Sequence, residues 1–183
     1  MPKPLPKGTE WNTGPKMALQ RPECAKLLGA IVVEMSLLEA SLAIAYADIA
    51  TWPNVKPEGT LEQYIAIESF EAIASLSQKR AILINALRRR GIDKAVVDDY
   101  SGLLHQIQDL YSKRSKSAHG RWVVADTLPN SLIHIRNAAR YSEAEVYDLA
   151  DFEEILDEIS TVGSRVQRFF FDVIRPSLAA TTS

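Results

Sequence analysis

The segment that begins at Pro22 and runs to Trp52 constrains the fold most. Its apolar residues recur at alternating spacings of three and four, the pattern of one face of a long α-helix. The helix should end before Trp52, because Pro53 cannot continue the hydrogen-bond ladder. Its most apolar part, residues 27–50, contains three acidic residues, which are costly inside lipid, so we interpret it as a core helix. The apolar seam consists of Leu28, Ile31, Met35, Leu38, Leu42, Ala45 and Ile49.

Two further helices follow this segment. Thr60 is a good cap for a second helix, with Gln63 at the capping-box position, and the helical period then continues up to Gly91. Asp93 caps a third helix that runs to Gly120. In this third helix Arg114 falls where the period calls for an apolar side chain.

The last third of the chain changes period. Residues 122–124 and 132–135 read as two short strands joined by a turn. A fourth helix then opens at Asp148 or Asp151 and is stopped by Pro176. The predicted fold class is therefore mainly α, an antiparallel four-helix up-and-down bundle with a short β-hairpin between helices three and four.

The length of 183 residues suits one domain with additional end segments. We predict an extended N-terminal arm over residues 1–21, a helical-bundle domain over residues 22–176 and a C-terminal tail over residues 177–183. Two interpretations of the arm stay open, a disordered terminus or an arm that packs on a neighbour through Trp11.

Composition excludes several functional classes. The net charge of −2 gives no general basic field, so contact with a nucleic acid requires a local patch. Cys24 is the one cysteine, which rules out an internal disulfide and a multi-cysteine zinc site and favours a reducing compartment. The first residues do not resemble a signal peptide. We therefore expect a cytoplasmic protein with no membrane contact, no cofactor and no dedicated metal site.

Two of the three histidines are best explained without chemistry. His105 lies four residues before Asp109 on the third helix, which favours a surface pair or a subunit contact. His134 alternates with its isoleucine neighbours in the second strand, so we expect it to face solvent. The third histidine, His119, has a different setting.

His119 belongs to a segment that gathers reactive groups at the end of the third helix. Residues 111–122 contain four cations, three serines, a histidine and two aromatic side chains. The cations can contact phosphate oxygens, and Arg114 can do so through two parallel hydrogen bonds. His119 can exchange a proton near neutral pH. These are the minimum tools for cleaving RNA without a metal. The predicted catalytic residues are Arg114 and His119, and the predicted substrate-binding residues are Tyr111, Lys113, Ser115, Lys116 and Arg121.

At these positions the sequence resembles the HEPN domains, helical bundles whose signature is Arg, a polar residue and, after four to six intervening residues, His. Arg114, Ser115 and His119 match this signature, and the layout matches over residues 22–176. The resemblance implies a metal-independent endoribonuclease that acts as a homodimer, with two copies of the motif meeting across a two-fold axis. It also implies a role in toxin or defence systems, with a cognate antitoxin or another protein as partner.

The main alternative is a dimeric, non-catalytic helical-bundle module that binds a protein partner, a nucleotide or RNA. Two departures from the family favour it: Ser115 stands where Asn, Asp or His is usual, and Arg121 stands where a tyrosine is common. The cations also suit the negative end of a helix dipole, as does the 88–90 arginine run. Arg114 and His119 are about 140° apart on an ideal helix, so they share a face only if the helix ends or bends between them.

Overall fold

The computed structural model describes residues 2–14, 16–135 and 143–181. The chain divides into two compact units. Unit 1 consists of Met1–Met35 and Leu110–Ser160, and unit 2 consists of Ser36–Asp109 and Thr161–Ser183.

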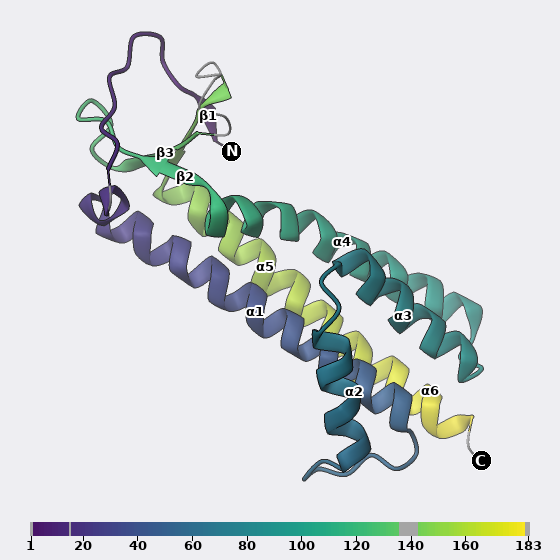
Figure 1. Cartoon of the computed structure of the whole chain (residues 1–183). Coiled ribbons are helices and arrows are strands. Elements are labelled where there is room, and N and C mark those ends of the chain that lie inside the picture. The colour runs from purple at the N-terminus through teal and green to yellow at the C-terminus, as the bar shows by residue number, and fades with distance from the viewer. Residues whose placement is uncertain (1, 15, 136–142, 182–183) are drawn as a thin grey trace. The chain divides into compact units, whose positions relative to one another are not determined.

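The chain is mainly helical, as predicted, and it also has a small sheet (Figure 1). Helices α1, α4 and α5 contribute residues to both units. The helices are α1 (Pro22–Thr51), α2 (Leu61–Glu71), α3 (Leu76–Arg89), α4 (Lys94–His119), α5 (Leu149–Phe169) and α6 (Arg175–Ala180), with a 3-10 turn η1 (Met17–Gln20) and a π-helical turn η3 (Phe170–Ile174). The strands are β1 (Lys3–Pro4), β2 (Arg121–Val123), β3 (Ser131–Ile135) and β4 (Glu145–Asp148).

Helix α1 confirms the predicted seam and the predicted end before Trp52. All the seam residues except Leu28 are buried. Outside the seam, Leu37 and Ile44 are more than half accessible, whereas Ala43 and Asp48 are buried. By length and composition α1 could also cross a membrane, since its most apolar stretch has a mean hydropathy of 1.9, with 28% of that stretch buried. The core helix of a soluble protein passes the same test.

The predicted second helix is in fact two helices, α2 and α3. Its start is as predicted: Thr60 accepts a hydrogen bond from the Gln63 backbone, and the Gln63 side chain accepts one from the Thr60 backbone. The chain then leaves the helix after Glu71, and Ser75 caps α3 by accepting from the backbone of Gln78. The spacing of apolar residues continues across this break. That spacing indicates which side chains are buried, but it does not indicate where the backbone hydrogen bonds of a helix stop.

Helix α4 matches the predicted third helix. Asp93 caps it by accepting a hydrogen bond of 2.8 Å from the backbone of Ala95. Gly91 has a φ of 73°, the left-handed conformation that ends α3. Within unit 2, α4 packs on the end of α5 through stacked rings of Tyr100 and Phe169, 5.8 Å apart.

Helix α5 begins as predicted but does not end as predicted. Asp148 and Asp151 form a reciprocal cap in which each side chain accepts from the other's backbone N–H. Pro176 does not stop the helical path, which continues through the π-helical turn η3 into α6. The proline lies in the first turn of α6, directly after the π-helical turn. Leu178, beyond it, is fully buried.

The predicted strands β2 and β3 are present, but they belong to a four-stranded antiparallel sheet rather than to one hairpin. The strand order is β1-β4-β3-β2. Strand β4 precedes α5, and β1 comes from the N-terminal arm. The predicted elements, four helices and one hairpin, therefore differ from the observed ones in the split second helix and in the larger sheet.

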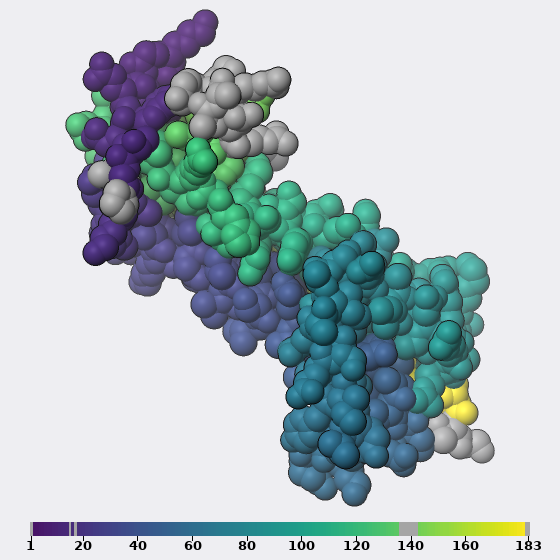
Figure 2. All heavy atoms as spheres, in the orientation of Figure 1, coloured from purple at the N-terminus to yellow at the C-terminus, as the bar shows by residue number. Residues whose placement is uncertain are grey.

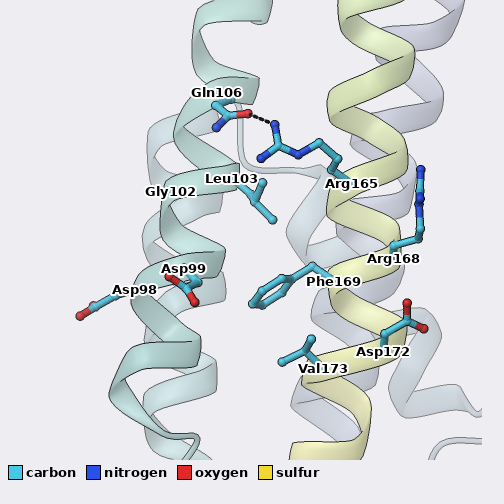
Figure 3. A pocket seen from close by; sticks show the side chains of 10 residues that line it. All are labelled: Asp98, Asp99, Gly102, Leu103, Gln106, Arg165, Arg168, Phe169, Asp172 and Val173. Carbon is cyan, nitrogen blue, oxygen red and sulfur yellow. Dashed lines mark hydrogen bonds between the residues drawn. The ribbon is translucent and has the colours of Figure 1, made fainter.

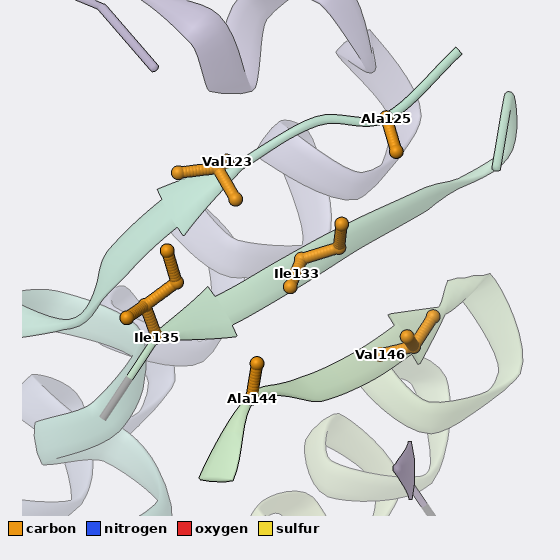
Figure 4. Packing of buried hydrophobic residues seen from close by; sticks show 6 residues of the cluster. All are labelled: Val123, Ala125, Ile133, Ile135, Ala144 and Val146. Carbon is orange, nitrogen blue, oxygen red and sulfur yellow. The ribbon is translucent and has the colours of Figure 1, made fainter. Parts of the chain in front are cut away.

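One face of the sheet carries an apolar cluster (Figure 4), and the N-terminal arm, purple in Figure 2, lies next to this part of unit 1. Leu5 and Trp11 of the arm pack on this cluster. The backbone of Asn12 also donates to the carbonyl of Val124 at 2.8 Å. Trp11 therefore packs on its own chain, an arrangement outside the two interpretations drawn from the sequence. The cluster consists of Val123, Ala125, Ile133, Ile135, Ala144 and Val146.

The opposite face of the sheet carries polar and aromatic side chains that are also buried. His134 is only 4% exposed, so the prediction that it faces solvent is wrong. Alternation along β3 placed it on the face opposite the isoleucines, as expected, but that face packs against other side chains. Phe152 at the start of α5 is among them, with its ring 5.6 Å from that of Trp122.

Candidate functional site

The candidate site lies in unit 1, where α4 passes into β2. Gly120 forms the joint and donates a backbone hydrogen bond of 2.8 Å to the carbonyl of Lys116. A Cβ at this position would lie 2.2 Å from that carbonyl oxygen and 2.6 Å from Cδ2 of His134. The joint therefore requires glycine for close approach, and it fixes the direction in which the chain leaves α4.

Two of the predicted substrate-binding cations are held by carboxylates of unit 1. Lys113 pairs with Glu158 on α5, and Nζ of Lys116 lies 3.2 Å from Oε2 of Glu145 on β4. The lysine side chains are 41% and 38% exposed, so solvent still reaches both. Partly exposed pairs of this kind contribute little to stability, and the lysines can exchange partners with a bound anion.

Arg114 differs from these lysines because its Nε is buried and finds no hydrogen-bond partner among the described residues. Its guanidinium carbon lies 5.8 Å from the ring centre of Tyr111, one turn earlier. A buried N–H without an acceptor is unfavourable, and an arginine keeps its charge at any accessible pH. The side chain is therefore suited to receive an anionic acceptor, and the aromatic ring limits its motion.

His119 is the last residue of α4 and is exposed. Ser115 is half-buried, and Arg121 is exposed on β2. For all three side chains, the described part of the chain offers no hydrogen bond or ion pair.

Helix α4 is continuous through Arg114 and His119. Within one chain these two side chains therefore lie about 140° apart around the helix axis and do not share a face.

Sequence reasoning missed the centre of polar contacts at this end of the sheet, the carboxylate of Glu145. Its Oε2 accepts a hydrogen bond of 3.2 Å from the hydroxyl of Tyr147 and pairs with Lys116. Nδ1 of His134 lies 3.9 Å from the same oxygen. Burial and the nearby Glu145 carboxylate raise the pKa of Tyr147, so this hydroxyl keeps its proton and acts as a donor at neutral pH.

The register of the sheet brings these residues together. Trp122 on β2 is opposite His134 on β3, and His134 is opposite Glu145 on β4. Tyr147 lies two residues after Glu145 and so faces the same side. From the sequence, only the alternation of side chains between the two faces of each strand could be predicted. No local signal predicted that β3 pairs with β4, ten or more residues further along the chain.

A cavity of about 250 Å³ opens beside this row of side chains. Lys113, Lys116 and Ser117 line it from α4, and Trp122 and Tyr147 line it from the sheet. The remaining lining residues are Pro2 of the arm and three residues of α5, Asp151, Glu154 and Ile155.

Unit 2 has a more open cavity of about 560 Å³ between α4 and α5 (Figure 3). Phe169 points into it, and Arg165 donates a hydrogen bond of 3.2 Å to Gln106 across it. Aspartates line it together with two arginines, and no histidine, cysteine or serine is among the lining residues that the structure describes. It is a groove of mixed charge without a nucleophile or a general base that titrates near neutrality.

Among the described residues no cluster of three or more His, Cys, Asp or Glu side chains could hold a metal ion. His105 does not use Asp109 as its partner: its Nδ1 lies 2.7 Å from a guanidinium nitrogen of Arg80. Comparisons with protein-family models, curated proteins and solved structures find no match to this chain.

Proposed function

We propose that the protein is a HEPN-like, metal-independent endoribonuclease that works as a homodimer, with the ends of two α4 helices forming one site. An up-and-down arrangement of the long helices, a cytoplasmic location and a role in a toxin or defence system with a protein partner are parts of the same proposal. The catalytic residues would be Arg114 and His119.

One observation carries this proposal: the buried Nε of Arg114 has no hydrogen-bond partner among the described residues, while Lys113 and Lys116 are paired. Buried polar atoms are nearly always satisfied, so an orphaned one on a cation suggests an anion that binds there. A phosphate oxygen is such an acceptor, and arginine recognises phosphate well. His119, exposed at the helix end, would supply an imidazole that can accept and donate a proton.

The proposed reaction is a transesterification within the RNA. One His119 removes the proton from a ribose 2′-hydroxyl, and the 2′-oxygen forms a bond to phosphorus. The bond from phosphorus to the 5′-oxygen breaks, and the second His119 gives that oxygen a proton. Arg114 stabilises the charge that develops on the phosphate. The products are a 2′,3′-cyclic phosphate and a 5′-hydroxyl end.

The proposed mechanism requires a dimer because Arg114 and His119 of one chain point in different directions from α4. Because α4 does not bend between them, one chain cannot direct both side chains at one phosphate from the same helix face. In an isologous dimer His119 of one subunit can face Arg114 of the other. The same angle also favours the alternative, a dimeric non-catalytic module that binds RNA, a nucleotide or a protein partner.

The test is cleavage of mixed RNA in EDTA by the purified protein and by His119→Ala and Arg114→Ala. We expect both substitutions to lower the cleavage rate by about 100-fold or more, the usual range for loss of an acid–base group or of a transition-state contact. Thermal unfolding checks that each variant is folded.

Two matched controls distinguish loss of the catalytic site from a general effect of removing a histidine or a positive charge. His105→Ala removes a histidine from the middle of α4, and Arg88→Ala removes an exposed arginine at the end of α3. Both should cleave RNA at the rate of the unmodified protein. If the unmodified protein is dimeric and cleaves no RNA, the binding module replaces the nuclease as the better account.

A further inference from the structure

The cations at the end of α4 fall into two classes. Lys113 pairs with Glu158 of α5, and Lys116 pairs with Glu145 of β4. Arg114, between them in sequence, has no hydrogen-bond partner at its buried Nε among the described residues. The two carboxylates therefore occupy two of these three cations and leave the third open to an anion from outside the chain.

Both ion pairs lie at the surface of unit 1 and can open. The four side chains, Lys113, Glu158, Lys116 and Glu145, are 37% to 44% exposed. Because water and salt screen pairs with this exposure, each pair favours the closed form only slightly. An anion that reaches either lysine can therefore replace its carboxylate at a small cost.

A tethered carboxylate competes better against a free anion than against a strand. Glu158 and Glu145 belong to the same chain as the lysines, so their effective concentration there is of the order of millimolar or higher. A dissolved phosphate ion must exceed that concentration to displace them. In an RNA strand that is held by one phosphate at Arg114, the neighbouring phosphates are tethered as well, and they compete on equal terms.

We propose that Glu158 and Glu145 are specificity-determining residues. In the free protein they hold Lys113 and Lys116, and only a strand with several phosphates displaces them. The two lysines are three residues apart on α4, close to one helical turn, so one strand can contact both. This step deepens the proposed function and rests on it for the choice of RNA as the strand.

The test measures binding without cleavage, by titration of the full chain with single-stranded 2′-O-methyl RNA, which has no free 2′-hydroxyl to react. Glu158→Gln keeps the size of the side chain and removes its charge. We expect it to bind the strand about two- to fivefold more tightly than the unmodified chain, the range that corresponds to one exposed ion pair. Glu145→Gln should act in the same direction through Lys116.

Inorganic phosphate tests the exclusion of free anions. It is added to the same titration, with the ionic strength held constant by chloride. We expect phosphate to weaken strand binding more in Glu158→Gln than in the unmodified chain, because Lys113 of the variant has no tethered anion to keep phosphate away.

Two double variants with the net charge of the unmodified chain show whether the gain in affinity depends on Lys113. Combining Lys113→Gln with Glu158→Gln removes the released lysine, so the strand should bind no more tightly than to the unmodified chain. Combining Lys26→Gln with Glu158→Gln removes an exposed lysine elsewhere in unit 1 and should keep most of the gain. Because the two variants carry the same net charge, a difference between them cannot come from the net charge of the protein.

Four outcomes overturn the inference: Glu158→Gln binds the strand no more tightly than the unmodified chain, the two double variants bind equally, phosphate weakens both forms equally, or no form binds the strand. Thermal unfolding checks that each variant is folded, and if Glu145→Gln is not, Glu158→Gln decides the question alone. Strand binding that responds to Glu158→Gln without any cleavage of natural RNA would leave this inference standing and remove the nuclease. Cleavage with no response to Glu158→Gln would do the reverse.

Discussion

Asp148 shows how single side chains set the structure of unit 1. Its carboxylate accepts a hydrogen bond from the backbone of Asp151, and this bond lowers the pKa of Asp148 below the ordinary value. The charged form is thus favoured in the folded state. The stabilisation is present at neutral pH and is lost as the pH falls through the lowered pKa.

We expect Asp148→Ala to lower the free energy of unfolding by about 1 kcal/mol at pH 7, as loss of a helix cap does. The difference from the unmodified protein should begin to shrink below about pH 4, where Asp148 of the unfolded state takes up a proton, and should continue to shrink as the pH falls through the lowered pKa of the folded state. Asp148→Asn keeps an acceptor without a titrating group, so its stability should stay near the original at pH 7. Urea unfolding at both pH values measures these differences, and an equal gap at both values would contradict the role of the charge.

Gly120 is the residue on which the joint between α4 and β2 depends. Gly120→Ala should destabilise the protein by about 1–3 kcal/mol, because the added methyl group overlaps the Lys116 carbonyl and the His134 ring. Gly102→Ala is the matched control, since a Cβ there meets nothing within 4 Å. In the middle of α4 it should instead stabilise by about 0.5–1 kcal/mol. Thermal unfolding of both variants shows whether stability falls in Gly120→Ala and rises in Gly102→Ala. Equal destabilisation of the two variants would be inconsistent with close packing at Gly120.

At the scale of elements, helix starts could be predicted from sequence better than helix ends. Thr60, Asp93 and Asp148 are caps that act on neighbouring residues, and local sequence records them. The start of α3 was missed although Ser75 is a local cap of the same kind, and the helical path through Pro176 has no comparable local signal. The sheet was underestimated for a similar reason, because β1 and β4 are short and pair with strands distant in sequence.

The N-terminal arm is the element whose role is easiest to test. Trp11→Ala should lower the stability of unit 1 by about 1–2 kcal/mol, because half-buried ring area leaves the apolar cluster of the sheet. Hydrogen exchange should become faster in β2 and β4 and stay unchanged in α2 and α3. Trp11→Phe keeps most of the contact and should show a smaller effect. Equal exchange in all three proteins would mean that the arm does not cover the sheet in solution.

For the candidate site, the sequence identified the end of α4 but not its surroundings. The cations, Arg114 and His119 could be found because they are adjacent in the chain. Glu145, Tyr147 and the buried His134 could not, because only the strand register places them beside Lys116. The orphaned Nε of Arg114 is likewise a property of packing that no spacing reveals.

At the scale of the whole molecule, the account depends on two chains. If one His119 acts as base and the other as acid, only dimers with two intact copies cleave RNA. The angle between Arg114 and His119 on a continuous helix also requires the second chain, because one chain cannot direct both side chains at one phosphate. In the proposed mechanism the site therefore exists only in the dimer, and the products of the reaction test that mechanism.

The most direct measurement is to incubate the unmodified protein with RNA in EDTA and to determine the chemistry of the new RNA ends. The account predicts 2′,3′-cyclic phosphate and 5′-hydroxyl ends, both missing when His119→Ala replaces the natural chain. Ends of any other kind, or cleavage that persists in His119→Ala, would contradict the proposed mechanism.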